Sequence, residues 1–277
     1  MTQDAEFFVR FWGVRGSIAC SGPETQRYGG NTSCLEVRCG ERLLVFDAGT
    51  GVRPLGLSLP SADPIELDQF FSHTHWDHIA GLPFFCPAYG ADNIIHVRAG
   101  HLAPSGTIEA ALRQAMSEPL FPVPLDVLHA TVTFEDFAAG ADLDLGDGIK
   151  VRTAPLNHPN GATGYRVDYD GKSICYVTDT EHVPGAPDQN ILGLIKGADV
   201  VIYDSTYTDD EFASYVGWGH STWQEGVRLC KAAGAKRLAI FHHDPGRDDD
   251  ALDDIGRQAA QEFAGAFVAR ERDMVVP

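Results

Sequence analysis

The sequence predicts an α/β protein in which two mixed β-sheets pack together and are covered by helices. Short apolar runs recur along the chain, separated by the Gly, Pro, Asn and Asp residues typical of turns. Longer amphipathic runs, typical of helices, are set among and after them. Strand runs with helices between them are typical of sheets that pack against each other under a helical layer.

The positions of the apolar runs and turn residues predict the individual elements. In the first half, we expect strands at residues 7–13, 34–39, 43–46, 67–71 and 94–97, with turns at 29–30, 40–41 and 49–51. In the second half, we expect strands at 131–134, 149–154, 164–169, 173–178, 200–203 and 237–241, and a turn at Asp142, Asp144 and Asp147. Amphipathic runs predict helices at 107–116, 221–233 and 249–263, whereas the proline-broken segment 119–124 should form a loop over the sheet.

Length and composition favour one domain spanning residues 1–277. A hydrophobic content of 44% is enough for a sizeable core, and no linker, low-complexity tract or internal repeat divides the chain. The net charge of −18 is opposite to the basic surface of proteins that bind nucleic-acid backbones. We therefore expect no nucleic-acid partner, although bound divalent cations could make one pocket attractive to a small anionic substrate.

The cysteines and the apolar segments bear on the cellular compartment. The six cysteines are scattered without a C-x-x-C pair, at Cys20, Cys34, Cys39, Cys86, Cys175 and Cys230. We expect them to be reduced thiols. The opening MTQDAEFFVR lacks the apolar core of a targeting segment, and no run approaches about 18 uninterrupted apolar residues. These features predict a cytoplasmic protein without membrane contact.

Residues 73–78, with the sequence HTHWDH, place four candidate metal ligands within six residues. They follow the expected strand 67–71, and an extended backbone directs His73 and His75 to the same face, so both can reach one cation. Asp77 and His78 are adjacent and cannot share a strand face, so the chain must turn after His75. The second pair can then serve a second cation a few ångströms away. This spacing predicts a metal site rather than a histidine-rich surface loop.

Further residues that can bind metals recur where downstream strand runs end. They are His158 after 149–154, Asp179 after 174–177, Asp204 after 200–203, and His242 and His243 after 238–241. Strand ends that meet at one edge of a sheet are where α/β proteins build sites, so these distant residues can converge on one pocket. A single loop histidine such as His158 would be ordinary, but the recurrence favours a shared site.

These ordered motifs resemble the metallo-β-lactamase superfamily over nearly the whole chain. The resemblance runs from FWGVRGS through FSHTHWDHIAGLP, LNHP, YVTDTEH and GHST to LAIFHHDP. The GHST motif, followed by an amphipathic helix and RLAIFHHDP, is most similar to the phosphodiesterase branch, which includes tRNA 3′-end endonucleases and cyclic phosphodiesterases. The resemblance implies a four-layer αββα sandwich of two mixed sheets with a binuclear metal site at one edge.

The resemblance also implies a ligand set. His73, His75 and His158 would bind one metal ion, Asp77, His78 and His242 the other, and Asp179 would bridge them. The sequence FHHDP offers two histidines for the last position; the proline register of the family favours His242 over His243, and strand alternation would point the two side chains in opposite directions. Imidazoles and carboxylates without cysteine suit Zn²⁺, Mn²⁺ or Fe²⁺, so we expect two divalent ions as cofactors.

The resemblance implies phosphodiester hydrolysis. Two close cations suit this reaction, because they would generate hydroxide near neutral pH and neutralise the charge of the phosphate oxygens. We expect Asp77 to orient the hydroxide. His220 is the candidate for stabilising the transition state or protonating the leaving oxygen, with Asp204 holding its other ring nitrogen. His220 could also be an ordinary loop histidine before a helix capped by Ser221 or Thr222, and the two roles are compatible.

The sequence carries weaker indications about the substrate. Arg15, Asn31 and His182 lie in segments that the family places near the site, so they are candidate substrate-binding residues, although such loop residues are often structural. Ribonuclease Z-type enzymes carry a basic arm between the third-histidine and aspartate motifs, whereas His158 and Asp179 are only 21 positions apart. Together with the acidic net charge, this spacing favours a small phosphodiester, such as a cyclic nucleotide, over tRNA.

Three alternatives to small-phosphodiester hydrolysis stay open. They are cleavage of tRNA 3′ ends or other nucleic acid, hydrolysis of thioesters or lactones, and a non-catalytic metal-dependent sensor. Segment 102–124 could form a wall or lid of the pocket or mediate homodimerisation.

Overall fold

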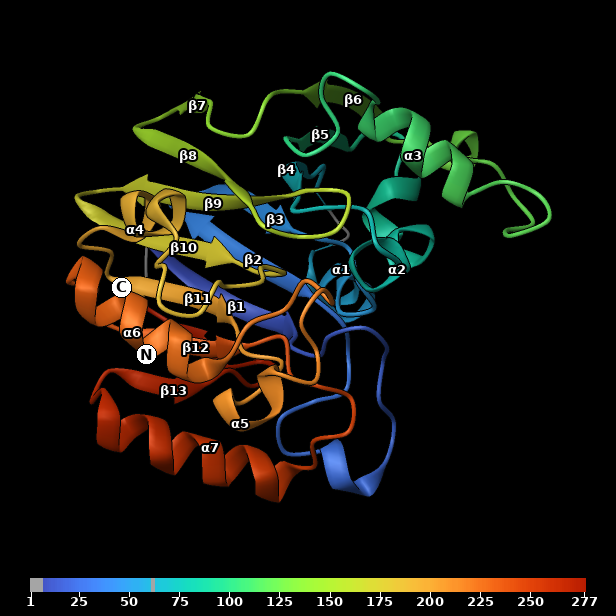
Figure 1. Ribbon diagram of the computed structural model, residues 1–277. Coiled ribbons are helices and arrows are strands. Elements are labelled where there is room, and N and C mark those ends of the chain that lie inside the picture. Colours follow the sequence, from blue (N-terminus) through green and yellow to red (C-terminus); the bar gives the residue numbers. More distant parts are fainter. Residues whose placement is uncertain (1–6, 61–62) are drawn as a thin grey trace.

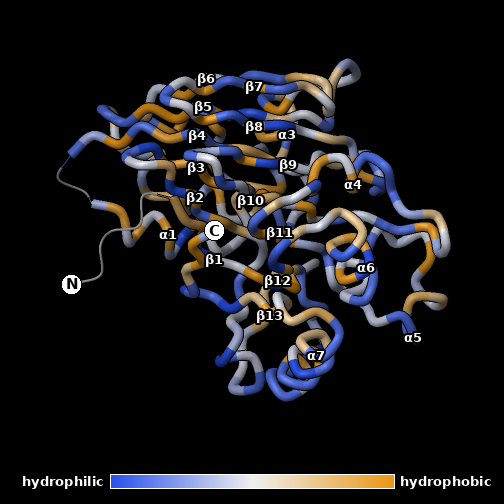
Figure 2. The backbone as a smooth tube through the Cα atoms, turned by 90° about the vertical axis from the view of Figure 1, so that its left-hand side faces the viewer, coloured by the Kyte–Doolittle hydropathy of each residue, from blue (hydrophilic) through white to orange (hydrophobic). Residues whose placement is uncertain are grey.

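The structure, a computed structural model, describes residues 7–60 and 63–277. Within this part of the chain, two seven-stranded sheets lie face to face and helices cover their outer faces (Figure 1, Figure 2). The first sheet has the order β14-β1-β2-β3-β4-β5-β6 and the second the order β13-β12-β11-β10-β9-β8-β7. The predicted sandwich of two mixed sheets is confirmed. Residues 1–6, in which we expect no targeting segment, lie outside the described residues.

The first sheet comes from the N-terminal half of the chain and is completed by the C-terminus. Its strands are β1 (Phe7–Gly13), β2 (Cys34–Cys39), β3 (Arg42–Phe46), β4 (Glu66–Phe71), β5 (Ile94–Ala99), β6 (Thr131–Asp136) and β14 (Met274–Val275). Pairing is antiparallel from β14 to β3 and parallel from β3 to β6. The parallel part brings the carboxyl ends of β3 and β4 to one edge of the sheet, where sites in α/β proteins form.

The second sheet has the same mixed plan. Its strands are β7 (Asp142–Gly146), β8 (Ile149–Leu156), β9 (Ala162–Tyr169), β10 (Lys172–Val177), β11 (Val200–Asp204), β12 (Leu238–Phe241) and β13 (Ala266–Val268). Pairing is antiparallel from β7 to β10 and parallel from β10 to β13. Strands β9 and β10 form a tight hairpin whose turn residues, Asp170 and Gly171, both have positive φ. The turn leaves no insertion between these two strands.

Aromatic side chains pack between the two sheets. Phe46 of β3 stacks on Phe70 of β4 with 5.1 Å between ring centroids, and it tilts against Tyr165 of β9 at 5.3 Å. The Tyr165 hydroxyl donates a hydrogen bond to the backbone carbonyl of Phe71 at 2.6 Å, across the interface between the sheets. Burying each large apolar side chain contributes roughly 1.5–3 kcal/mol, so this cluster fixes how the strand ends of one sheet face those of the other.

Helices cover the outer face of each sheet. The first sheet is covered by α1 (Val52–Ser58), α2 (Trp76–Ile79), α3 (Ile108–Ala115), η2 (Leu82–Phe84), η3 (Cys86–Tyr89) and η4 (Leu125–Val127), and the second by α4 (Gln189–Ile195), α6 (Trp223–Ala233) and α7 (Asp249–Glu262). Two short helices, η1 (Pro23–Thr25) and α5 (Asp209–Phe212), lie in connections. Helix α6 begins after Thr222, whose hydroxyl oxygen accepts a hydrogen bond from the backbone N–H of Glu225. No helix in the described residues is long and apolar enough to cross a membrane.

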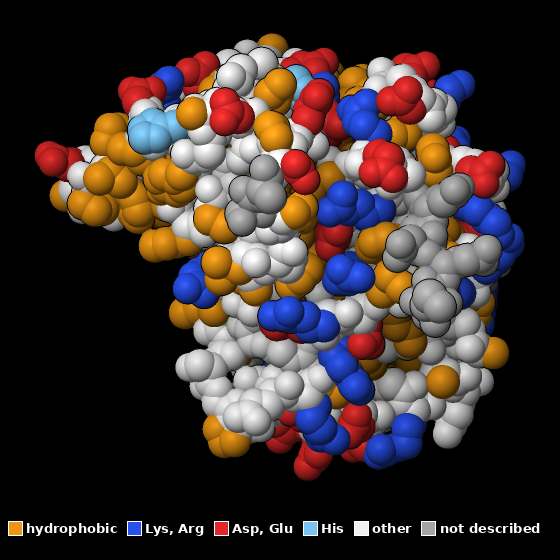
Figure 3. Space-filling view, turned by 180° about the vertical axis from the view of Figure 1, so that it is seen from behind, with side chains coloured by type: hydrophobic (Ala, Val, Ile, Leu, Met, Phe, Trp, Pro, Cys, Tyr) orange, Lys and Arg blue, Asp and Glu red, His pale blue; other side chains and the backbone are white. Residues whose placement is uncertain are grey.

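The predicted strands and helices are confirmed to within two residues at their ends, but other expectations need correction. The turn expected at Asp142, Asp144 and Asp147 is confirmed only at Asp147, which lies between β7 and β8. Asp142 and Asp144 lie in β7, because Leu143 and Leu145 alternate with them and pack against the core between the sheets. Helices α1 and α4 are absent from the prediction because each has only seven residues, too few to show a helical period clearly. Segment 119–124 is a loop, as expected, and it projects from the body of the molecule next to α3 (Figure 1). Apolar side chains are frequent on this projection (Figure 3).

Candidate metal centre

The ends of strands from both sheets meet at one edge and supply the site. Asp47 follows β3, His73 and His75 follow β4, His158 follows β8, Asp179 follows β10, Asp204 ends β11 and His242 follows β12. The structure therefore brings together residues that are far apart in the sequence, as the recurrence of polar residues at strand ends predicts.

Three of these residues turn the backbone in the left-handed region. Asp47, Asp179 and His242 have φ values of 59°, 55° and 60°. Residues other than glycine adopt this conformation only occasionally, although Asp and His do so more often than most. Three such residues at the ends of β3, β10 and β12 are typical of a functional site, where the surrounding structure holds the backbone in a costly conformation.

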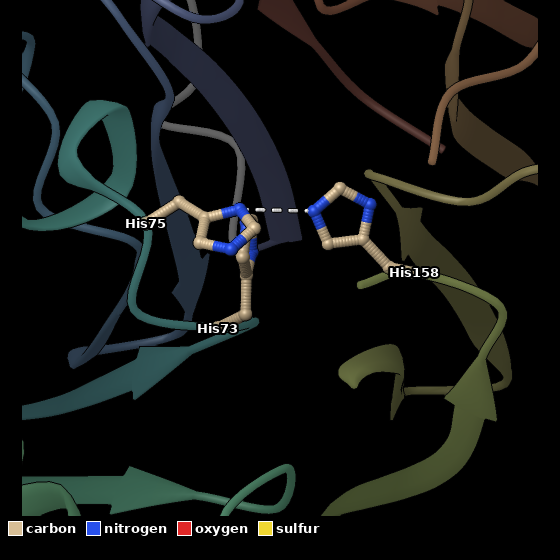
Figure 4. Close-up of side chains that lie close together, drawn as sticks. All are labelled: His73, His75 and His158. Carbon is tan, nitrogen blue, oxygen red and sulfur yellow. Dashed lines mark hydrogen bonds between the residues drawn. The ribbon is translucent and has the colours of Figure 1, made fainter. Parts of the chain in front are cut away.

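His73, His75 and His158 form the first cluster (Figure 4). The Nδ1 atom of His75 lies 3.0 Å from Nε2 of His158, and the His73 ring centroid lies 4.5 Å from that of His75 and 4.7 Å from that of His158. Burial lowers the pKa of all three imidazoles, which favours the neutral form whose lone pair can bind a metal ion. Three neutral imidazoles facing one point suit Zn²⁺, Mn²⁺ or Fe²⁺.

Asp77, His78, Asp179 and His242 form the second cluster. The Nε2 atom of His78 lies 3.2 Å from both Asp77 Oδ2 and Asp179 Oδ1. The Nε2 atom of His242 lies 3.3 Å from the same two oxygens. Burial opposes protonation of His78, but Asp77, Asp179 and Asp47 together raise its pKa well above the ordinary value. The cluster therefore favours positive charge, which a divalent cation would supply.

Asp179 lies between the two clusters. Its Oδ1 faces the second cluster, whereas its Oδ2 lies 3.7 Å from His73 Nε2 and 3.8 Å from His158 Nε2. Burial alone would raise the pKa of this carboxyl, but His242, His78 and His73 hold it well below its usual range. One oxygen directed at each cluster is the arrangement expected of a bridging carboxylate.

Two buried ring nitrogens test whether metal ions fit. His73 Nε2 and His78 Nε2 have no hydrogen-bond partner among the described residues, although the Nδ1 atom of each ring has one. A buried polar atom without a partner costs about 1–3 kcal/mol, a cost that coordination of a cation would remove. Both unpaired atoms face Asp179, so the donor sets fit two divalent cations that share this carboxylate.

Asp47 holds the second cluster from outside. Its carboxylate accepts hydrogen bonds from the backbone N–H and the hydroxyl of Ser72 at 2.7 and 2.8 Å, from the Tyr176 hydroxyl at 2.7 Å, and from His78 Nδ1 at 2.8 Å. The last contact makes Nδ1 the protonated nitrogen and directs the lone pair of Nε2 into the site. The residues expected at the site do not include Asp47, although it directly follows the strand run 43–46 and so carries the same signal as Asp179 and Asp204.

Backbone and hydroxyl groups orient two further imidazoles. His158 Nδ1 donates to the backbone carbonyl of Gly219 at 2.7 Å. Gly219 has a φ of 84°, and a Cβ atom there would lie 2.4 Å from His158 Nδ1, so only glycine allows this approach. The Thr206 hydroxyl lies 3.0 Å from His242 Nδ1 and donates to Asp204 Oδ1 at 2.8 Å. Both contacts leave Nε2 of the imidazole free to face Asp179.

His220 borders both clusters. Its Nδ1 atom lies 3.0 Å from Asp204 Oδ2 and 3.8 Å from Asp179 Oδ2, and its ring stacks on His242 at 4.9 Å. Burial would lower its pKa, but the Asp204, Asp179 and Asp77 carboxylates together outweigh burial and raise the pKa of His220 to about 9. Because Asp204 engages Nδ1, the Nε2 atom is the one that could donate a proton to a substrate oxygen.

His242 and His243 point in opposite directions. The His242 ring lies in the second cluster, whereas His243 Nε2 donates to the backbone carbonyl of Ala269 at 2.8 Å. Burial lowers the pKa of His243 to about 3, so this ring packs in the neutral form. The structure therefore places the first histidine of FHHDP in the site, the choice that the proline register favours.

Three residues considered for substrate binding have internal partners instead. Arg15 is fully buried, and its guanidinium donates to three backbone carbonyls. The Asn31 side chain donates to Glu271 Oε2 at 3.1 Å. The His182 ring stacks on Phe212 with 4.0 Å between centroids. These contacts fit the structural role that loop residues often have, so we do not assign Arg15, Asn31 or His182 to substrate binding.

Known proteins resemble the chain over most of its length. A family model described as the beta-lactamase superfamily domain matches residues 42–243. Ribonuclease Z of Haloarcula marismortui is 23% identical, and the alignment covers 96% of this chain and 95% of the relative. A diphosphatase from the PhnP family has a TM-score of 0.70 at 17% identity, covering 97% of this chain and 96% of that structure. Zn²⁺-bound PqqB from Methylobacterium extorquens has a TM-score of 0.71 at 16% identity, covering 98% and 100%.

Proposed function

Because the chain belongs to the β-lactamase superfamily, we propose that it is a phosphodiesterase with two metal ions. The observation that carries this proposal is Asp179, which presents one carboxylate oxygen to each of two ligand clusters. The proposed ligands are His73, His75 and His158 for one ion, Asp77, His78 and His242 for the other, and Asp179 for both. Zn²⁺ is the first ion to test, followed by Mn²⁺ and Fe²⁺, because imidazole-rich sites suit all three.

Several residues would act on the substrate in this scheme. When bound, two divalent cations supply an activated water and neutralise phosphate oxygens. Asp77, whose Oδ2 accepts a hydrogen bond from the backbone N–H of Ser17 at 2.8 Å, would orient the attacking water. His220, held at Nδ1 by Asp204, would donate a proton from Nε2 to the leaving oxygen or stabilise its developing charge.

We infer that the scissile diester joins ribonucleotides, and the end of an RNA chain is our first candidate substrate. The supporting observation is the likeness to a ribonuclease Z over nearly the whole length of both chains. This likeness weighs against our expectation that nucleic acid is excluded as a partner. It also favours a nuclease over our first expectation of a cyclic nucleotide.

A small phosphodiester is the second candidate, and two observations favour it. The hairpin of β9 and β10 closes through Asp170 and Gly171, so no arm for holding a long RNA lies between His158 and Asp179. The net charge of −18 would repel a polyanion outside the metal centre. These features predict weak contacts with RNA beyond the nucleotides nearest to the scissile bond.

We also propose that residues 1–277 act as one domain in the cytoplasm. The site supports a single domain, because one metal cluster joins His73 and His75 of the N-terminal sheet with His158 of the other sheet. The six cysteines, all free thiols, support the cytoplasmic location.

A panel of substrates tests the proposed function. Protein loaded with Zn²⁺ or Mn²⁺ should hydrolyse phosphodiesters, and chelation of the metals should abolish the activity. The panel should hold a tRNA precursor with a 3′ trailer, a short oligoribonucleotide, cyclic mononucleotides and bis(p-nitrophenyl) phosphate. A higher kcat/KM for RNA, falling steeply with salt, supports the nuclease, whereas a higher kcat/KM for small diesters with weak salt dependence supports the second candidate. Turnover of thioesters or lactones alone, or of nothing, would refute the proposal.

A further inference from the structure

A row of aromatic rings leads from His220 to the protein surface. Tyr207 meets His220 edge-on with 6.1 Å between ring centroids, and Tyr215 stacks on Tyr207 at 4.2 Å with an interplanar angle of 8°. Trp218 then meets Tyr215 edge-on at 5.5 Å and 90°. Tyr207 is buried, whereas Trp218 is 63% exposed. The row therefore begins at the border of the metal centre and ends in an open indole ring.

The loop that carries Trp218 is tied to the site. The backbone N–H groups of Gly217 and Gly219 both donate to Glu181 Oε2, at 2.7 and 2.9 Å. The carbonyl of Gly219 accepts the hydrogen bond from Nδ1 of His158, which is a proposed metal ligand. The backbone N–H of Trp218 donates to the carbonyl of Tyr215 at 3.1 Å. These hydrogen bonds fix the backbone of the loop before any ligand arrives, which lowers the entropy lost when a ligand binds there.

Two of the four tryptophans are exposed: Trp218 by 63%, and Trp76, which stands between the proposed ligands His75 and Asp77, by 56%. Trp12 and Trp223 are 3% and 2% exposed and pack in the interior. A single exposed apolar side chain on a surface needs no explanation by itself. Trp218 differs because it ends an ordered row of rings and lies two residues before His220, the proposed proton donor.

We propose that Trp218 is the stacking platform for a nucleobase of the substrate. This inference rests on the proposed function and deepens it, because it assigns the substrate to diesters that carry a base on the side of His220. Stacking on an aromatic ring tolerates any base, since every base has a π face. Tyr207 and Tyr215 would act as positioning residues that set where the indole lies relative to the phosphate.

Two ligands that differ only in the base test this inference. AMP and ribose 5-phosphate carry the same phosphate, so calorimetric titration of Zn²⁺-loaded protein with each one isolates the contribution of the base. We expect AMP to bind about ten- to a hundredfold more tightly than ribose 5-phosphate, the range for stacking one base. Trp218→Ala should lose most of this preference while its affinity for ribose 5-phosphate and its metal content stay unchanged. Trp218→Phe should retain part of the preference.

Val216→Ala is the matched control, because Val216 lies in the same loop and is also 63% exposed. It should bind both ligands as the unmodified protein does. The inference is overturned if Trp218→Ala keeps the full preference for AMP, or if it loses affinity for both ligands equally. Calorimetry needs no turnover, so a base preference that depends on Trp218 in a protein without hydrolytic activity would refute the proposed function alone. Hydrolysis without such a preference would refute only the role of Trp218.

Discussion

Replacing His220 with alanine separates catalysis from metal binding. The imidazole stands outside the proposed ligand set, with Nδ1 engaged by Asp204 at 3.0 Å and Nε2 left for the substrate. We therefore expect His220→Ala to keep both metal ions. Loss of a positioned acid or of a charge-stabilising donor should lower kcat about 10²- to 10⁴-fold, roughly 3–5 kcal/mol of transition-state stabilisation.

The size of this loss should depend on the leaving group. A nitrophenolate needs little protonation when the bond breaks, so His220→Ala should lose least on bis(p-nitrophenyl) phosphate. A ribose hydroxyl is a poor leaving group, and on such a substrate the loss should reach the upper part of the range. The assay is therefore kcat on one substrate of each type, together with elemental analysis of the variant protein.

Asp204→Asn offers a second measurement on the same pair. The carboxylates of Asp204, Asp179 and Asp77 raise the pKa of His220 to about 9 against the effect of burial, and the protonated ring is the active form of an acid. Activity that needs this proton is present below the pKa and is lost as the pH rises through it. Removing the charge of Asp204 should lower the pKa, so the basic limb of the kcat/KM profile should move to lower pH.

One result would restrict the role given to His220, and another would contradict it. Equal losses on good and poor leaving groups would exclude proton donation and leave electrostatic stabilisation alone. Loss of a metal ion in His220→Ala would make this residue a ligand, a role for which its Nδ1 atom, 3.8 Å from Asp179 Oδ2, is close enough.

Three further predictions concern the metals. Elemental analysis after saturation with Zn²⁺ should find two ions per chain, and Asp179→Ala should lose both; one ion in the unmodified protein would refute the binuclear assignment. Asp47→Asn removes the charged group that accepts the hydrogen bond from His78 Nδ1, so it should weaken metal affinity about 10- to 100-fold in a chelator competition. Unchanged affinity would show that Asp47 does not orient His78. Gly219→Ala would place a Cβ atom 2.4 Å from His158 Nδ1, so it should lower both the metal content and the Tm. A variant that holds both metal ions and has a normal Tm would contradict the need for glycine at this position.

Part of the site could be predicted because local spacing determines it. His73 and His75 lie two residues apart after a strand, and the helix α2 that begins at Trp76 turns Asp77 and His78 toward the second cluster. Asp47 shows the limit of such reasoning. Its position after β3 is visible in the sequence, but its contact with His78 arises only because β3 and β4 are neighbours in the sheet.

Other residues could not be placed, because the direction of a loop side chain depends on what packs around it. Arg15 and Asn31 lie in segments that the family places near the site. The Arg15 guanidinium nevertheless donates to backbone carbonyls, and the Asn31 side chain donates to Glu271. The Asp142–Gly146 strand could not be predicted for a related reason. Its aspartates are typical of a turn, and only the packing of Leu143 and Leu145 against the core between the sheets makes the segment a strand.

The sequence by itself determined the fold class, the residue types at the metal centre and the turn after His75, because strand alternation and short spacings act within a few residues. The tertiary structure decided that one oxygen of Asp179 faces each cluster, that His242 rather than His243 enters the site, and that Trp218 ends a row of rings starting at His220. These relations join residues from different strands and loops. Their geometry depends on how the two sheets pack through Phe46, Phe70 and Tyr165, and no local pattern in the chain encodes that register.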